Sequence, residues 1–426
     1  KERKAAYGLR LPKASVTGAY IYMGDDMAID MNDLKAPVGG VLEGLGNLPN
    51  IPPAILQQAS SLLAKDWSMK LQDRSFANVG ANITLPLYTG GKINAANNAA
   101  KIKIEEVAEK GNQTRGSLVS ELTERYYGLV LALQVVEVRR QVLEGMQHHL
   151  SDAKALEANG IIAKGERLYA EVHTAEAERE LLKAQKTVET LYSALSNTLG
   201  GDESTYIPAT SMFILNDIED VNYFKDLAKQ HSPLLKQVGY KKQLATENMR
   251  LQRADFAPQV ALTGMAAFYN YQVSPIIPKW AVGAGVSLKI FDGLNREYKF
   301  SAAKSQIRQV EAVGHQAESD ILTLIDKLYN EMVTYSQQLP SVNASGRFAE
   351  EYLRIKEEAF KEGAAPSSDV VDARLNLAKI RIERLQAAYY YDMMLARLLE
   401  ACGQSELFPD YGKRAAAMPI RYEHDF

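Results

Sequence analysis

The chain has 426 residues, of which 24% are charged and 46% are hydrophobic, and its formal net charge is −3. These are ordinary values for a folded protein, and the nearly balanced charge excludes a strongly basic surface for nucleic acid. The single cysteine, Cys402, excludes a disulfide framework and a thiolate metal site, and we expect it to be packed. No apolar run reaches the roughly 18 residues of a transmembrane helix, but a transmembrane β-strand would escape such a search.

One unit of the sequence occurs twice. Val79–Lys101 and Val282–Lys304 follow the same plan, an alternating run, a glycine turn and a polar helical sequence, displaced by 203 residues. The same displacement relates Gly90 to Gly293, Tyr126 to Tyr329, Gly160 to Gly363, Leu195 to Leu398 and Gly200 to Gly403. The sequence therefore predicts two structural repeats in one object.

The repeat also sets the expected boundaries. The first repeat covers residues 1–200, with a β-hairpin at 12–90, a long outer loop at 24–72 and long helices at 92–200. The second covers 232–403, with a helix at 232–255, a β-hairpin at 257–291 and long helices at 294–403. Residues 201–231 and 404–426 fit neither repeat and are expected to form an equatorial connector and a tail outside the helices. A counterpart of helix 232–255 would precede residue 1, so we expect a leading helix and any targeting segment to lie before this chain.

Four segments alternate with a period of two residues: Lys13–Tyr22, Ala77–Leu85, Pro258–Phe268 and Trp280–Ile290. By itself this pattern also fits half-buried strands of a soluble sandwich. Each segment is long enough to cross a bilayer at a tilt. In that case the polar face would line a lumen and would include Asn78, Asn82, Thr84, Ser287 and Lys289.

The longest predicted helix is Lys92–Ala158, where apolar residues recur at steps of three and four. At about 1.5 Å per residue it spans roughly 100 Å, a length typical of coiled coils and tubes. Pro340 is expected to kink or break the equivalent second helix. In the outer loop we expect one short helix, at Ile55–Ala64. The helical turn near Pro366 is expected to end in an N-cap made by the following serines.

Four strands cannot close in a bilayer, because each open edge leaves backbone groups unpaired in lipid. Two chains would supply about eight strands, which fill their own interior, whereas three would supply about twelve and leave a lumen. Helices that leave the twelve-stranded barrel at equivalent positions would extend its wall as a helical tube. This argument predicts a trimeric pore.

Several stretches then resemble the TolC-like outer-membrane efflux channels (the outer membrane factor family), over nearly the whole chain. They are Leu85–Gly91, Ile290–Gly293, Glu362–Gly363 and Ser368–Ala373. The resemblance implies an α+β membrane protein and a trimeric channel, with four β-strands per chain that build a 12-stranded β-barrel. A long-helix α-barrel and two internal repeats complete the fold. It further implies the outer membrane of a Gram-negative bacterium, with the helical barrel in the periplasm.

The resemblance implies a passive exit duct of a tripartite efflux pump for small molecules such as drugs and toxic compounds. Its partners would be two further copies of the chain, a periplasmic adaptor (membrane fusion) protein, an inner-membrane pump of the RND or ABC type, and outer-membrane lipid. No nucleic acid, cofactor or catalysis is expected, since no nucleophile and base stand together. Two alternatives stay open, a type I protein-secretion duct and a structural coiled-coil trimer without a channel.

Asp369 and Asp372 lie where the family has the paired aspartates of a constricted pore aperture, so the resemblance implies that role for them. They are three residues apart on one predicted helix face, so a threefold axis would collect six carboxylates, which attract cations. A simpler explanation is a solvated first helical turn, where acidic residues suit the helix dipole. The family's arginine is replaced by Ala365, and Glu166 and Arg167 are candidates for the missing gating contact.

The two helical turns are the expected adaptor-docking tips, unless they are simply tight turns. The residues concerned are Gly160, Ile161, Ile162, Ala163, Lys164 and Gly165 in the first tip, and Gly363, Ala364, Ala365, Pro366, Ser367 and Ser368 in the second. His148 and His149 lie on a polar stretch of helix and are expected to face solvent.

Overall fold

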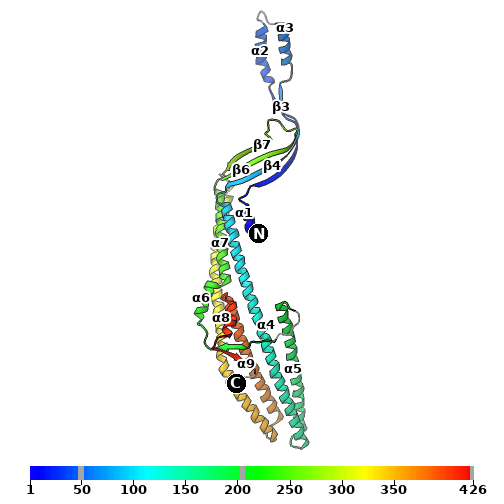
Figure 1. The fold of residues 1–426 in the computed structure, drawn as a ribbon, viewed down its shortest axis with the longest axis vertical. Coiled ribbons are helices and arrows are strands. Elements are labelled where there is room, and N and C mark those ends of the chain that lie inside the picture. Colours follow the sequence, from blue (N-terminus) through cyan, green and yellow to red (C-terminus); the bar gives the residue numbers. More distant parts are fainter. Residues whose placement is uncertain (47–51, 202–206, 423–426) are drawn as a thin grey trace. The chain divides into compact units, whose positions relative to one another are not determined.

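The computed structural model describes residues 1–46, 52–201 and 207–422 (Figure 1). The chain forms two compact units, one made of Lys1–Lys101 with Leu244–Gln306 and the other of Ile102–Gln243 with Ile307–Phe426. Small parts of the expected outer loop, connector and tail, at 47–51, 202–206 and 423–426, lie outside the described residues.

The first unit contains an antiparallel four-stranded sheet in the order β1-β4-β6-β7. Its strands are β1 (Lys13–Tyr22), β4 (Ser75–Tyr88), β6 (Gln259–Tyr271) and β7 (Trp280–Ser287). Strand β7 ends earlier than the alternation predicts, so Lys289 lies beyond it. Arg296 donates to the backbone carbonyl oxygens of Lys289 and, at 2.8 Å, of Ile290, which removes acceptors that a longer strand would use.

The pairing of β4 with β6 joins the two sequence repeats in one sheet. Ile83 lies opposite Gly264 and Thr84 opposite Thr263, and the register shifts between Val79 and Gly80. A Cβ at Gly80 would come within 2.8 Å of a backbone oxygen of β6, so the close approach at this bulge requires glycine.

The outer loop is more structured than the sequence predicts. It contains β2 (Met27–Asp30), the 3₁₀ turn η1 (Asn32–Leu34), α2 (Lys35–Gly46), α3 (Pro53–Leu63) and β3 (Ser68–Gln72), and β2 pairs with β3 as an antiparallel ribbon. Helix α3 lies where one short helix is predicted. Helix α2 is not predicted, because Pro37 and its glycines are poor helix formers that only packing against a neighbour can offset.

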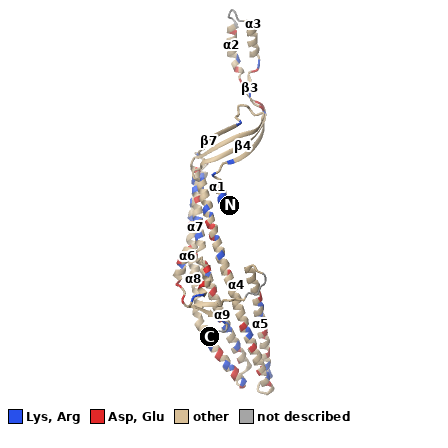
Figure 2. Cartoon of the chain, viewed as in Figure 1, with Lys and Arg blue, Asp and Glu red and all other residues tan. Residues whose placement is uncertain are grey.

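The remaining helices are long hairpins and short flanking pieces. They are α1 (Glu2–Gly8), α4 (Lys92–Ala158), α5 (Lys164–Leu199), α6 (Val221–His231), α7 (Pro233–Arg253), η2 (Ala254–Phe256), α8 (Asn295–Lys361), α9 (Ser367–Ala401), η3 (Ser405–Leu407) and α10 (Phe408–Gly412). The helix predicted over Lys92–Ala158 is confirmed as α4. Charged side chains are spread along these helices, whereas the sheet carries few (Figure 2). In the described parts of the chain, no helix combines the length and the apolar character that a membrane span requires.

Of the two outcomes predicted at Pro340, a kink or a break, the break is wrong, because α8 continues through the proline. The proline removes one backbone donor from the helix. Its side chain lies on the exposed side of α8, where water can hydrogen-bond the carbonyl group that loses its partner.

The core of the second unit includes segments that the sequence predicts on the outside. Strand β5 (Met212–Leu215) pairs with β8 (Ala417–Ile420), and all four side chains of β5 are buried. They join a cluster that contains Tyr391 of α9 and Cys402, which directly follows α9. The expected packing of Cys402 is confirmed, since its side chain is buried.

Candidate functional site

The two helical hairpins of the second unit turn in the same way. After α4 and after α8 the chain passes through a glycine in the left-handed region, Gly160 with φ +72° and Gly363 with φ +71°. Each glycine N–H donates to a carbonyl oxygen three residues earlier, of Glu157 and Phe360 respectively, at 2.9 Å. Glycine is favoured here because a side chain would strain this backbone conformation. The displacement of 203 residues in the sequence therefore corresponds to a repeated local structure.

The two tips touch within one chain. A Cβ at Gly363 would lie 3.1 Å from Cγ2 of Ile161, and the side chain of Ile162 packs against a buried cluster that contains Phe360. The other expected tip residues lie in or beside the turns, with Ala163 as N-cap of α5, Lys164 and Gly165 in its first turn, Ala364 and Ala365 in the second turn, and Ser368 in the first turn of α9.

At the tips, Ser367 connects the second hairpin to the first. Its backbone N–H donates to Oε2 of Glu166 at 2.6 Å, and its Oγ lies 2.6 Å from Nε2 of His149. The predicted serine N-cap is wrong, because the N-cap of α9 is Pro366, which makes no side-chain cap bond. The carboxylate of Glu166 satisfies a free N–H at the start of α9 instead, where the helix dipole favours negative charge.

Arg167 does not make the same connection. Its Nε contacts Oε2 of Glu157 at 2.6 Å, and its Nη1 contacts Oε2 of Glu171 at 2.5 Å. Both partners belong to the first hairpin. Of the two candidate gating residues, the structure brings Glu166 to the second tip and leaves the ion pairs of Arg167 inside the first.

The two candidate aperture aspartates differ in their surroundings. Oδ2 of Asp369 accepts from Nζ of Lys356 at 2.6 Å, and this hydrogen bond raises the pKa of Lys356. Asp372 is exposed and makes no ion pair with any described residue. Burial, followed by the charge of Asp372, raises the pKa of Tyr169, so the free carboxylate lies near α5. No pattern in the sequence points to Lys356, because it lies in α8 whereas its partner Asp369 lies in α9.

A cavity of about 580 Å³ lies between α4, α8 and α9 in the second unit, close to the tips. Its wall includes Gly145, whose missing Cβ leaves room for the guanidinium group of Arg374. Arg374 forms an ion pair with Glu357, and burial lowers the pKa of Arg374. The glycine thus accommodates a partly buried charge next to the contact between the hairpins.

His149 lines the same cavity, and its predicted exposure is wrong. Its side chain is 4% exposed, with its ring centroid 4.4 Å from that of Phe360, whereas His148 faces solvent as expected. Burial, and then the positive charge of Arg374, lowers the pKa of His149 to about 4. His149 is therefore neutral at pH 7 and holds Ser367 as an uncharged imidazole. Among the described residues, no group of three or more His, Cys, Asp or Glu side chains is placed to hold a metal ion.

A second set of expected site residues lies in the sheet of the first unit. The strand register puts Asn78, Asn82, Thr84 and Ser287 on one face of the sheet. Asn78 donates to Asn270 Oδ1 at 2.7 Å and Asn82 donates to Thr17 Oγ1 at 2.9 Å, so polar side chains are linked across strands. The opposite face is apolar and open, with Val16 and Trp280 each 70% exposed.

Comparison with known proteins agrees with this geometry. A model of the family described as "Outer membrane efflux protein" matches residues 56–201 and 225–404. Protein CyaE of Bordetella pertussis is 25% identical over 285 residues, which make up 64% of this chain and 59% of that relative. The chain thus matches somewhat more than half of the length of this curated relative.

Solved structures show the same fold at low identity. The outer membrane protein VceC from Vibrio cholerae superposes with a TM-score of 0.70 at 16% identity, over 94% of this chain and 89% of that one. The MtrE outer membrane channel of Neisseria gonorrhoeae, in its open state, gives a TM-score of 0.65 at 16% identity, over 95% and 83% of the two chains. The fold expected from the sequence is confirmed. Because the family model matches most of the chain, the protein belongs to the outer membrane efflux protein family, whose members are transport proteins of the bacterial outer membrane and not enzymes.

Proposed function

We propose that the protein is the outer-membrane exit duct of a tripartite efflux system, through which small molecules such as drugs and toxic compounds pass without chemical change. The observation that carries the proposal is the four-stranded sheet, which exposes apolar side chains on one face and polar side chains on the other. A sheet with two open faces of opposite character suits a wall between lipid and water.

The same sheet supports a homotrimer. Within the described chain β1 and β7 each pair on one side only. In lipid each unpaired backbone group costs several kcal/mol, so these edges need partners from other copies. Three chains would supply about twelve strands and leave a lumen lined by Asn78, Asn82, Thr84 and Ser287, whereas about eight strands would fill their own interior.

The helical tips are the proposed docking end for a periplasmic adaptor protein, which would connect the duct to an inner-membrane pump of the RND or ABC type. Ile161 is 56% exposed at the first tip, and Ala364 and Pro366 are exposed at the second. Small and apolar residues at a protruding turn allow close contact with another helical hairpin. The polar contacts of Ser367 keep the two turns together as one surface.

We further propose that Asp372 forms the cation-attracting ring of the aperture. The carboxylate of Asp369 is already neutralised by Lys356, so three exposed Asp372 side chains around a threefold axis would carry most of the negative charge. Rings of carboxylates attract cations and bind divalent ions more strongly than monovalent ones.

The test is ion conductance of the purified full-length chain in a planar bilayer. We expect discrete channels that divalent cations block from the side of the tips. Asp372→Asn should remove more of this block than Asp369→Asn, and Lys356→Gln, which frees Asp369, should strengthen it. A chain that forms no channels would contradict the duct, and would favour the structural coiled-coil trimer. Channels whose block is unchanged in the Asp369→Asn, Asp372→Asn double variant would contradict the ring alone.

Small-molecule export and protein secretion require separate measurements in cells. A strain that lacks the protein should become more sensitive to toxic compounds, and the wild-type gene should restore resistance. Unchanged sensitivity together with the loss of an exported protein from the medium would instead assign the duct to protein secretion.

A further inference from the structure

The helical hairpin formed by α2 and α3 is a feature that the proposed duct does not explain. It follows β1 and precedes β4, and α4 begins at the opposite end of β4. The chain order therefore puts the hairpin at the end of the strands away from the long helices. The corresponding connection between β6 and β7 has no helix. The hairpin is thus an addition to one of the two strand pairs.

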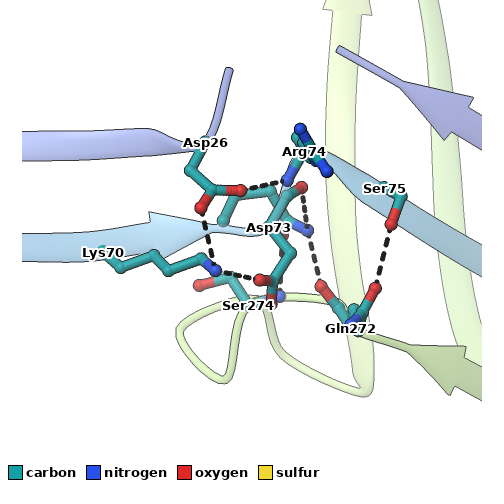
Figure 3. A network of polar contacts seen from close by, with 8 residues as sticks. Asp26, Lys70, Asp73, Arg74, Ser75, Gln272 and Ser274 are labelled. Atoms are coloured by element: carbon teal, nitrogen blue, oxygen red, sulfur yellow. Dashed lines mark hydrogen bonds and ion pairs between the residues drawn. The ribbon is translucent and has the colours of Figure 1, made fainter. Parts of the chain in front are cut away.

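A polar network fixes the base of this hairpin to the sheet (Figure 3). Nε2 of Gln72 donates to the backbone oxygen of Gln272 at 2.6 Å, and Oε1 of Gln72 accepts from the backbone N–H of Ser274 at 2.7 Å. Lys70 forms ion pairs with Asp26, at 3.0 Å, and with Asp73. The two hydrogen bonds of Gln72 join the β2–β3 ribbon to the turn after β6, and the ion pairs of Lys70 hold the two ends of the ribbon together, so the hairpin is held at the rim of the sheet.

Above this base, one side of α2 is apolar and open to solvent. Leu34, at the end of η1, and Val38, Val41 and Leu45 of α2 follow one another at steps of four, three and four residues, and their side chains are 54%, 44%, 65% and 41% exposed. On α3, Ile55 and Leu62 are seven residues apart and are 57% and 52% exposed. Such spacing is the pattern by which helices pack side by side in coiled coils.

The composition of the hairpin indicates what covers this stripe. Helix α2 carries only Lys35 and Glu43 as charged residues, and α3 carries none. Figure 2 shows the few charges on these two helices. A helix that binds a membrane surface usually combines a basic face with aromatic residues, and both helices contain neither aromatic residues nor arginine. A surface without net charge and with an apolar stripe suits an identical surface, because symmetric association brings no like charges together.

We propose that the hairpins of three copies pack against one another through this apolar stripe and form a helical cap over the outer mouth of the duct. The inference rests on the proposed trimer. Strands of three copies that close around one axis bring their outer ends, and with them the three hairpins, around the same axis.

The first test uses cysteine cross-linking in the full-length chain. Cys402 is the single cysteine and is buried, so an introduced cysteine has no competing partner on the surface. Val41→Cys should form a disulfide-linked dimer when cells are treated with a mild oxidant, and a reducing agent should remove that band. Gln57→Cys, an exposed position on α3 away from the stripe, is the matched control and should stay monomeric.

The second test measures conductance after the stripe is changed. Val41→Asp combined with Leu45→Asp should separate the hairpins and raise the single-channel conductance about twofold or more, since a constriction in series limits the current. Conducting wild-type channels without a Val41→Cys dimer, and with unchanged conductance in the double variant, would overturn the cap but leave the duct intact. Protection of Val41→Cys from a water-soluble maleimide without a dimer would point to a different occupant and would also overturn it. If the wild-type chain forms neither channels nor trimers, the proposed function itself fails.

Discussion

Ser367 is fully buried at the point where the two hairpins meet, and both of its polar groups are used. One partner, Glu166, is charged and comes from α5, while the other, His149, is neutral and comes from α4. Because the buried hydroxyl group depends on an uncharged imidazole, acid should weaken this contact. The charged groups that face His149 are Arg374, Asp152 and Glu166, and Arg374 has the largest effect on its pKa after burial.

We therefore predict that the stability of the tip depends on pH through the protonation of His149. Its pKa falls from 6.5 to about 4 on folding, so between these values the unfolded tip binds a proton that the folded tip does not. Stability of the tip should be complete above pH 6.5 and should decrease as the pH falls toward 4, by at most about 3 kcal/mol. Hydrogen exchange of the tip amides at pH 7 and pH 5, corrected for intrinsic rates, measures this loss.

His149→Gln should flatten that dependence, because glutamine keeps a hydrogen-bonding group without titrating. His148→Gln is the matched control at the exposed neighbouring position and should behave as the wild type does. An equal pH response in the wild type and in His149→Gln would show that other groups cause it.

At the scale of elements, the two repeats share their turns but not the surroundings of these turns. Gly90 and Gly293 occupy equivalent positions before α4 and α8, with φ of +64° and +73°. A Cβ at Gly90 would lie 2.6 Å from the backbone oxygen of Ala254 and 2.6 Å from Cβ of Ala257, whereas a Cβ at Gly293 would meet no atom within 4 Å. At Gly293 only the backbone conformation requires glycine, whereas at Gly90 both the backbone conformation and the close neighbouring atoms require it.

This difference predicts unequal effects of the same substitution. Gly293→Ala should cost about 1–2 kcal/mol from backbone strain alone. Gly90→Ala adds an overlap with backbone atoms and should cost about 1–3 kcal/mol more. Thermal denaturation of the two variants in detergent measures the difference, and equal melting temperatures would contradict the environment described for Gly90.

At the scale of the whole molecule, the sheet decides how the protein meets lipid and water in the proposed duct. Ala81 and Asn82 are neighbours near the middle of β4 and lie on opposite faces. On the proposed lipid face, Ala81→Arg should impair assembly, by about 2–4 kcal/mol near the bilayer mid-plane. Asn82→Arg, on the proposed lumen face, should assemble normally and shift the channel toward anions.

The measurement compares the amount of each variant in outer-membrane fractions with its ion selectivity in a bilayer. Normal assembly of Ala81→Arg together with loss of Asn82→Arg would reverse the assignment of the two faces.

The repeat, the four strands and the long helices could be predicted from the sequence, because periodicity and the placement of glycines are local properties. It also placed Asp369 and Asp372 on one helix and the glycine turns at the tips, which follow from spacing in the chain. The burial of His149 and the ion pair between Lys356 and Asp369 could not be predicted in this way, since both depend on which helices pack against each other. The same reason applies to β5, whose four apolar residues became core only when β8 and α9 covered them, and to α2, whose weak helix-forming sequence gives little local signal. Contacts between segments far apart in the chain are hard to recognise in a single sequence, whereas the pattern of apolar residues within one strand or helix can be read from it directly.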